Sequence, residues 1–181
     1  GGAGDDAMSG GDGDDIYVVD STSDTVTEDP SKGTDLIRSS VSFTASADVE
    51  NLTLTGSNNI DATGNVLNNI LRGNSGNNTL TGGDGDDVMS GGDGDDIYAV
   101  DSTSDTVTEN FSQGTDLIYS SVSFTASADV ENLTLTDSNN IDATGNVLNN
   151  ILGGNSGDNT LTGQDGDYNL FGNGGDDTLD G

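Results

Sequence analysis

Residues 82–99 consist of one nine-residue unit that occurs twice in succession, as Gly-Gly-Asp-Gly-Asp-Asp-Val-Met-Ser and Gly-Gly-Asp-Gly-Asp-Asp-Ile-Tyr-Ala. The glycines permit backbone angles that a side chain would forbid, so the first six residues of each unit can form a tight turn. Each turn ends in an aspartate, Asp87 or Asp96, and is followed by x-U-x, where U is the large apolar residue Met89 or Tyr98. The spacing predicts very short strands that alternate with glycine-rich turns.

A glycine-rich turn that ends in a carboxylate offers backbone carbonyl and carboxylate oxygens, and this set of hard ligands suits calcium. The composition points to the same ion. Three basic residues face 33 acidic ones, which gives a formal charge of −30, and only 29% of the chain is hydrophobic. Such a chain does not fold unaided, whereas bound divalent cations relieve its self-repulsion and compensate for a sparse core. We expect calcium as the partner, and neither nucleic acid nor an anionic membrane.

A larger repeat contains the small one. Residues 1–81 align with residues 82–162 without gaps, and ten of the 81 positions differ, which leaves 71 identical. Residues 163–181 begin a third copy. We therefore treat residues 1–181 as one segment of repeats. The nonapeptide phase also continues into degenerate turns, in which the position of the aspartate is held by Asn69, Asn78 or Asp105. Asparagine tolerates the left-handed conformation and offers a neutral oxygen.

The nonapeptide phase is lost between residues 35 and 58, and again in the equivalent part of the second copy. There, apolar and polar residues alternate along residues 36–44, which predicts one longer strand with a buried face. Residues 51–55 alternate in the same way, and we expect residues 45–48 to form a bend between the two strands. No 3.6-residue period occurs in the chain, so the sequence predicts no helix.

These repeats resemble the RTX (repeats-in-toxin) family, whose nine-residue calcium-binding unit has the same pattern. The resemblance implies an all-β fold, a right-handed parallel β-roll or β-solenoid in which two nonapeptides make one coil and each turn stacks on the turn two units away. One nonapeptide is then half a coil, and an 81-residue copy has the length of nine of them, an odd number. Either successive copies present their turns on opposite edges, or residues 35–58 use an even number of longer half-coils. The apolar U residues then form the core: Met8, Tyr17, Leu71, Leu80, Met89, Tyr98, Leu152, Leu161, Leu170 and Leu179.

The resemblance also implies where calcium binds, between stacked turns and held by aspartates and turn carbonyls. The aspartates that match the family pattern are Asp6, Asp15, Asp87, Asp96 and Asp177, with Asp24 and Asp105 in degenerate turns. The implied pairs are Asp6 with Asp24, Asp87 with Asp105, Asn78 with Asp96, and Asn159 with Asp177. The implied neutral ligands are the carbonyls of Gly83, Gly85, Gly92 and Gly94. EF-hand loops are excluded, because no Asp-rich loop carries the closing glutamate at its twelfth position.

One turn departs from the pattern, because Tyr168 stands where Asp87 stands in the preceding copy. Its partner two units earlier, Asn150, is also uncharged, so a site between the two turns would lack a carboxylate. We expect calcium to occupy the Asp87–Asp105 site first, then the sites at Asp96 and Asp177, and not the turn of Tyr168. We expect the ring of Tyr168 to lie along the edge, near Phe171.

Catalysis is not expected, because the chain has no histidine and no cysteine, and its serines have no base to activate them. Rows of threonine and asparagine either face solvent or form a polar surface that binds sugar or ice. The sequence favours a calcium-stabilised structural or adhesive segment of a secreted bacterial protein, in an extracellular fibre, surface layer or large adhesin. The alternative is a folding and secretion module of an exoenzyme such as a protease, lipase or epimerase. Exposed strand edges at the ends of a solenoid predict end-to-end self-association.

Overall fold

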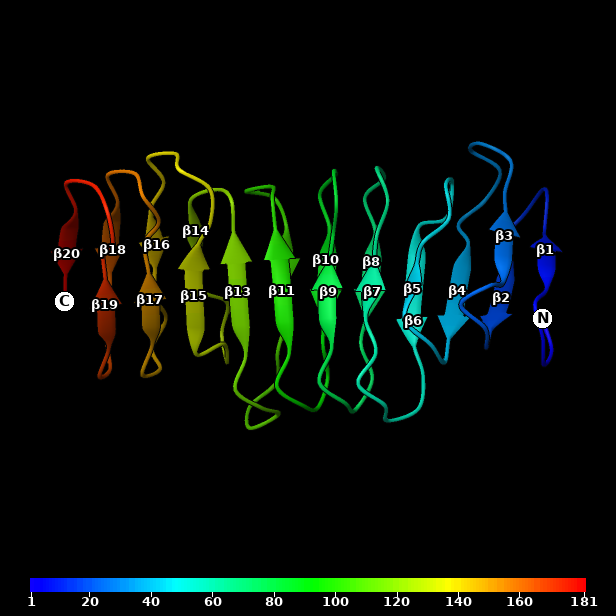
Figure 1. Ribbon diagram of the computed structural model, residues 1–181, viewed down its shortest axis with the longest axis horizontal. Helices are drawn as coiled ribbons and strands as arrows, with labels where there is room; N and C mark the ends of the chain where they lie inside the picture. The colour runs from blue at the N-terminus through cyan, green and yellow to red at the C-terminus, as the bar shows by residue number, and fades with distance from the viewer.

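In the computed structural model, which describes residues 1–181, the chain forms a parallel β-solenoid of 20 short strands and no helix. Figure 1 shows the coils side by side in one row, with the strands of the two faces one behind the other and the two termini at opposite ends. No helix of the length and hydrophobicity needed to cross a membrane is present. The strands are β1 (Ala7–Ser9), β2 (Ile16–Val19), β3 (Thr25–Thr27), β4 (Leu36–Ser39), β5 (Phe43–Thr44), β6 (Asn51–Leu54), β7 (Ala62–Thr63), β8 (Ile70–Arg72), β9 (Thr79–Thr81), β10 (Val88–Ser90), β11 (Ile97–Val100), β12 (Thr106–Val107), β13 (Leu117–Ser120), β14 (Phe124–Thr125), β15 (Asn132–Leu135), β16 (Ala143–Thr144), β17 (Ile151–Gly153), β18 (Thr160–Thr162), β19 (Asn169–Phe171) and β20 (Thr178–Asp180).

Successive strands alternate between the two faces of the solenoid. The odd-numbered strands form the pair β1–β3 and the eight-stranded sheet from β5 to β19, and the even-numbered strands form the sheets β2–β12 and β14–β20. Every pairing is parallel, and in the nonapeptide coils the paired residues are 18 positions apart, as for Leu71 with Met89. Two nonapeptides therefore make one coil, as the resemblance implies.

Each 81-residue copy contains nine strands, β1–β9 in the first copy and β10–β18 in the second. Because nine is odd, equivalent strands of the two copies lie on opposite faces. Strand β2 belongs to an even-numbered sheet, whereas its counterpart β11 belongs to an odd-numbered one. This settles the alternative that the sequence leaves open. Successive copies present their turns on opposite edges.

The apolar core is one row of side chains between the two faces. Of the ten U residues, seven are buried: Tyr17, Leu71, Leu80, Met89, Tyr98, Leu152 and Leu161. Met8 and Leu170 are half-buried against this row. Leu179 does not join the core, because it is 51% exposed on β20, which pairs with a strand on one side only.

Residues 36–44 do not form the single strand that their alternation predicts. They form β4 and β5, which lie on opposite faces of the solenoid. The chain turns the corner at Ser39, whose Oγ donates to the carbonyl of Val41 at 2.7 Å and accepts from its N–H at 3.2 Å. A buried hydroxyl that is satisfied two residues away permits a corner inside an otherwise regular alternation. The predicted bend is confirmed as a turn at residues 47–48, where Asp48 has a φ of 64°.

The close stacking of coils requires glycine at particular turn positions. The N–H of Gly73 donates to the carbonyl of Ser90 in the next coil at 2.8 Å. A Cβ atom added at Gly73 would overlap the carbonyl oxygen of Gly91 and the side chain of Asn78. Backbone atoms cannot move aside as a flexible side chain can, so the coils would have to separate.

Gly73→Ala is therefore expected to destabilise the calcium-loaded protein by about 1–3 kcal/mol, which lowers the thermal midpoint by roughly 2–10 °C. Circular dichroism in millimolar calcium measures this. The matched control is Gly153→Ala, because an added Cβ there meets only the side chain of Thr134, at 3.2 Å. The equivalent position of the first copy naturally carries Arg72 beside Thr53. Equal midpoints for the two variants would contradict the steric explanation.

Candidate metal sites

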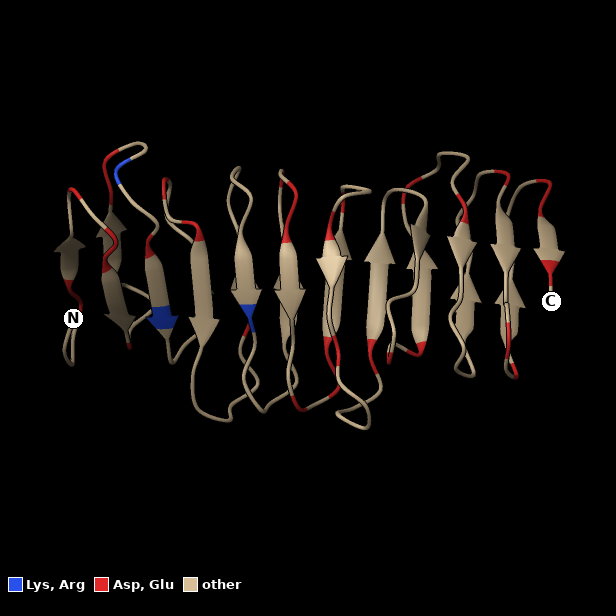
Figure 2. Cartoon of the chain, turned by 180° about the vertical axis from the view of Figure 1, so that it is seen from behind, with Lys and Arg blue, Asp and Glu red and all other residues tan.

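The residues at the aspartate position of the turns form a ladder along each edge of the solenoid. The backbone N–H of Asn69 donates to Oδ1 of Asp87 at 2.7 Å, and the N–H of Asp87 donates to Oδ1 of Asp105 at 2.9 Å. Each carboxylate thus accepts a hydrogen bond from the same position of the preceding coil. Figure 2 shows how the acidic residues gather at the turns and strand ends.

The four pairs implied by the sequence are neighbours in this ladder. In addition to the Asp87–Asp105 contact, backbone N–H groups donate to carboxylates at 2.8 Å from Asp6 to Asp24, at 2.7 Å from Asn78 to Asp96, and at 2.9 Å from Asn159 to Asp177. Every pair is 18 residues apart. The structure thus places both members of each pair in adjacent coils, and calcium ligation by these pairs remains a prediction.

Asparagine and aspartate have different surroundings in the ladder. Oδ1 of Asn78 accepts from the N–H of Asn74 in its own turn, and Nδ2 donates to the carbonyl of Ile60 in the preceding coil at 2.6 Å. The amide of Asn69 makes the same two kinds of contact. An amide carries both a donor and an acceptor, so an asparagine is satisfied by the protein alone. A carboxylate has no donor, so each of its oxygens needs a donor from the protein or a cation.

Asp87 shows what this means for a buried carboxylate. The residue is fully buried, and its Oδ2 has no hydrogen-bond partner. Burial raises the pKa of Asp87 to about 6, against the opposing effect of the hydrogen bond from Asn69. The predicted neutral ligands lie in the same kind of turn, and Gly83, Gly85, Gly92 and Gly94 all have positive φ, between 92° and 129°. A bound cation would satisfy the free oxygen and restore the charged form of the carboxylate.

Asp24 and Asp105, in the degenerate turns, are satisfied in a different way. Oδ2 of Asp105 accepts from the N–H groups of Asp101 and Ser102, both at 3.1 Å. Oδ2 of Asp24 has the equivalent contacts in its own turn. The backbone hydrogen bond from Asp6, together with these contacts, lowers the pKa of Asp24. Each of these carboxylates closes its own turn with backbone donors.

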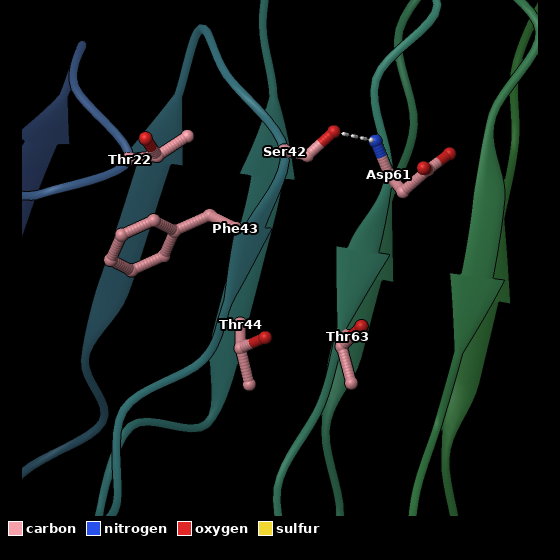
Figure 3. A pocket seen from close by; sticks show the side chains of 6 residues that line it. All are labelled: Thr22, Ser42, Phe43, Thr44, Asp61 and Thr63. Atoms are coloured by element: carbon pink, nitrogen blue, oxygen red, sulfur yellow. Dashed lines mark hydrogen bonds between the residues drawn. The ribbon is translucent and has the colours of Figure 1, made fainter.

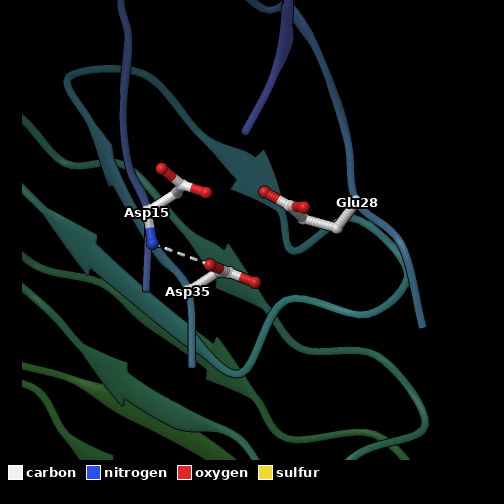
Figure 4. Close-up of side chains that lie close together, drawn as sticks. All are labelled: Asp15, Glu28 and Asp35. Carbon is white, nitrogen blue, oxygen red and sulfur yellow. Dashed lines mark hydrogen bonds between the residues drawn. The ribbon is translucent and has the colours of Figure 1, made fainter. Parts of the chain in front are cut away.

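Four acidic residues that the nonapeptide pattern does not include also lie at these edges: Glu28, Asp35, Glu109 and Asp116. Asp15, Glu28 and Asp35 each place a carboxylate oxygen within 4.8 Å of the other two, and Figure 4 shows the three carboxylates converging. Asp96, Glu109 and Asp116 form the equivalent cluster in the second copy. We refer to these as the first and second carboxylate triads. Sequence reasoning missed them because their glutamates lie outside the nine-residue phase. The one signal was that the chain has only four glutamates, and two of them fall at this equivalent position.

The second triad is strongly perturbed. Burial, followed by repulsion from Asp116 and Asp96, raises the pKa of Glu109 to about 8. Burial is also the main cause that raises the pKa of Asp96 to about 7 and that of Asp116 to about 6. Without a cation, this cluster therefore holds protons near neutral pH.

A separate polar depression of about 460 Å³ lies beside β5 and β7 (Figure 3). It is lined by Thr22, Ser42, Phe43, Thr44, Asp61 and Thr63. Thr44, Thr63 and Thr81 pair across three neighbouring strands, β5, β7 and β9. The backbone N–H of Asp61 donates to Oγ of Ser42 at 3.0 Å. The depression has one carboxylate and no second acid or base, so it offers no catalytic pair.

Comparison with known proteins agrees with this geometry. The family model described as the RTX calcium-binding nonapeptide repeat (4 copies) matches residues 1–26, 63–98 and 144–179, which together are more than half of the chain. The chain belongs to this family. Its repeats are calcium-binding repeats, and the all-β solenoid is the fold that the resemblance implies.

One curated relative is an endo-1,3-1,4-beta-glycanase, ExsH, of Rhizobium meliloti, which is 44% identical over 66 residues. The match covers 36% of this RTX chain and 14% of the glycanase. The chain therefore spans about one seventh of that relative. No solved structure matches.

The raised pKa values predict how pH affects the calcium-free protein. In the unfolded chain these carboxyls titrate near 4, whereas in the fold Asp87, Asp96, Glu109 and Asp116 titrate between about 6 and 8. The folded state binds more protons in that window, so its stability is fully present below pH 4 and is lost as pH rises through 6 to 8. In chelator, circular dichroism should show coil at pH 8.5 and recovery of β signal at pH 5. Millimolar calcium should give β signal at both.

A high concentration of potassium chloride in chelator at pH 8.5 is the control, because it screens surface repulsion without supplying a divalent ligand. It should leave the chain unfolded. A complete β spectrum in chelator at pH 8.5 would show that the fold does not depend on calcium.

The turn of Tyr168 interrupts the ladder, and the absence of calcium from this turn remains a prediction. The ring lies against Gly163 and Gly181, and Phe171 is 55% exposed. No side chain of this turn accepts from the N–H of Asn150, although its counterpart Asn69, in the first copy, donates to Asp87 in the next coil. The missing carboxylate therefore removes both a hydrogen-bond acceptor and a possible ligand.

Tyr168→Asp is expected to restore this carboxylate and to lower the calcium concentration at the folding midpoint several-fold, because affinity rises with the number of charged ligands. Calcium titration by circular dichroism measures the midpoint. Gln164→Asp adds the same charge to the same turn, at a residue with a φ of 69° that aspartate tolerates. It should have little effect. If both variants shift the midpoint equally, the effect is general charge and not ligation.

Proposed function

We propose that this chain is a calcium-stabilised structural or adhesive segment of a secreted protein, located in an extracellular fibre, a surface layer or a large adhesin. It has no catalytic role of its own in this proposal. The observation that carries it is the parallel pairing along ten coils, which is interrupted once on each face, between β3 and β5 and between β12 and β14, in two copies that differ at ten of 81 positions. With a strand spacing near 4.8 Å, ten coils form a rod roughly 45–50 Å long.

Calcium dependence supports a role outside the cell. A chain with a charge of −30 and a thin core stays unfolded where calcium is scarce. It then folds where calcium reaches the millimolar concentrations that many extracellular modules require. This is compatible with export of the unfolded chain by type I secretion, the route implied by the RTX family. The fold would form only after export. The carboxylates whose repulsion prevents folding inside the cell would then bind calcium outside it.

The second candidate is a folding and secretion module of an exoenzyme. It is favoured by the match to an endo-1,3-1,4-beta-glycanase, of which this chain covers 14%. Both proposals require calcium-coupled folding, so that property does not distinguish them. Self-association does, because a fibre segment needs contacts between rods and an appended module does not.

In the 181-residue chain, β1 and β20 each pair with one strand only, and Leu179 is half-exposed on β20. We expect these edges to stack end to end in calcium. Analytical ultracentrifugation should show a mean mass that rises with protein concentration, and Leu179→Lys should lower it by placing a charge on the open end.

The control is Val147→Lys, at a residue that is 73% exposed in a turn away from both ends. It should associate as the unmodified chain does. A chain that folds in calcium but remains monomeric at all concentrations would favour the exoenzyme module.

A further inference from the structure

The second carboxylate triad is buried and has nothing in the protein to neutralise it. Asp96, Glu109 and Asp116 are 0%, 7% and 2% exposed. The three basic residues of the chain are Lys32, Arg38 and Arg72, so residues 82–181 contain none. The one salt bridge joins Lys32 to Asp12, at the surface. Three buried acids without a counter-ion are costly, which requires either protons or a cation.

The free oxygens of the triad identify where a cation would lie. Oδ1 of Asp96 accepts from the N–H of Asn78, whereas Oδ2 is buried without a partner. The hydroxyl of Tyr98 donates to Oε1 of Glu109, whereas Oε2 is buried without a partner. Oδ1 of Asp116 accepts from the N–H of Asp96 at 2.8 Å. Two buried oxygens without partners thus belong to Asp96 and Glu109, whose carboxylates converge with that of Asp116.

The surrounding fold holds these groups in position. Gly91 has no side chain, and a Cβ there would overlap Oδ2 of Asp96 and crowd the hydroxyl of Tyr98. Its N–H donates to that hydroxyl at 2.7 Å. Tyrosine at this U position therefore fixes Glu109, whereas the preceding nonapeptide carries Met89, which has no hydroxyl.

Glu109 comes from the segment between β12 and β13, residues 108–116, which closes over the turn of residues 91–96. The N–H of Gly94 donates to the carbonyl of Gln113 at 2.6 Å, and Nε2 of Gln113 donates to Asp93 at 2.6 Å. In the first copy, Lys32 makes the equivalent contacts, with Gly13 and with Asp12. Both segments are thus fixed on their turns by the same two contacts.

We propose that each triad is a calcium site in which a glutamate from outside the nonapeptide pattern, Glu109 or, in the first copy, Glu28, is an additional ligand beside the two aspartates. The donors are all carboxylate oxygens, which are hard ligands, and oxygens within 4.8 Å of one another match the separation of ligands on a cation with bonds of about 2.3–2.6 Å. The first triad is more open, because Asp15 is only half-buried, but Oδ2 of Asp15 and Oε1 of Glu28 are likewise unpartnered. The inference depends on calcium binding and not on the adhesive or structural role.

Glu109→Gln tests this site, because glutamine keeps the shape and the acceptor for Tyr98 but removes the charge. In calcium, the variant should have a lower thermal midpoint, and native mass spectrometry should count one calcium fewer. In chelator at pH 8.5 it should instead gain β signal, since one of three repelling buried charges is gone. Glu28→Gln combined with Glu109→Gln should lose two ions. Asp137→Asn, in an exposed turn, removes one charge elsewhere. It should change neither the number of bound calcium ions nor the β signal in chelator.

Terbium provides a second measurement that does not depend on counting ions. Energy transfer from Tyr98 should excite a lanthanide bound in the second triad. Tyr98→Phe should reduce that emission, and Glu109→Gln should weaken terbium binding by about tenfold or more. An unchanged ion count for Glu109→Gln, with higher stability both in calcium and in chelator, would show that the triad is neutralised by protons. That result would overturn the proposal.

Discussion

The hydrogen bond from the backbone N–H of one turn to the carboxylate of the next coil is the contact on which the remaining structure depends. Where it is present in the nonapeptide turns, it spans 18 residues, for example from Asn69 to Asp87, and so supports the register of the strands that follow those turns. It also removes the carboxylate from water. Since a buried carboxylate with one oxygen unsatisfied is unfavourable, the same contact that orders the coils creates a need for a cation.

The ladder meets this need in two ways. Where the position holds asparagine, as at Asn78, the amide donates to the preceding coil and accepts within its own turn, so no ion is required. Where it holds a fully buried aspartate, as at Asp87, one oxygen remains free. The copies mix both kinds of residue. Part of each copy is therefore satisfied by the protein alone, and we expect calcium at particular coils and not uniformly along the rod.

Much of this fold could be predicted from the sequence, because a turn motif of fixed length also fixes the pairing of the strands around it. The degenerate turn that ends in Asp105 follows from the phase alone, and the structure buries both its aspartate and the apolar Val107 two residues later. The corner at Ser39 was missed, because an alternation of period two continues through it and the buried hydroxyl is satisfied locally. The triads were missed because Glu109 reaches its neighbours through a coil that departs from the nine-residue phase, and only three-dimensional packing brings it to Asp96.

The odd number of strands in each copy has a mechanical consequence. Nine half-coils rotate each successive copy by half a turn about the solenoid axis, so consecutive copies are related approximately by a twofold screw. A repeat by translation alone therefore needs two copies, or 162 residues. The triad at Asp15 and the triad at Asp96 consequently lie on opposite edges. Any contraction or expansion of a triad when its ion is lost acts on one edge in one copy and on the other edge in the next. Over a pair of copies the two bending moments oppose each other, which favours a rod that stays straight as its ion content changes.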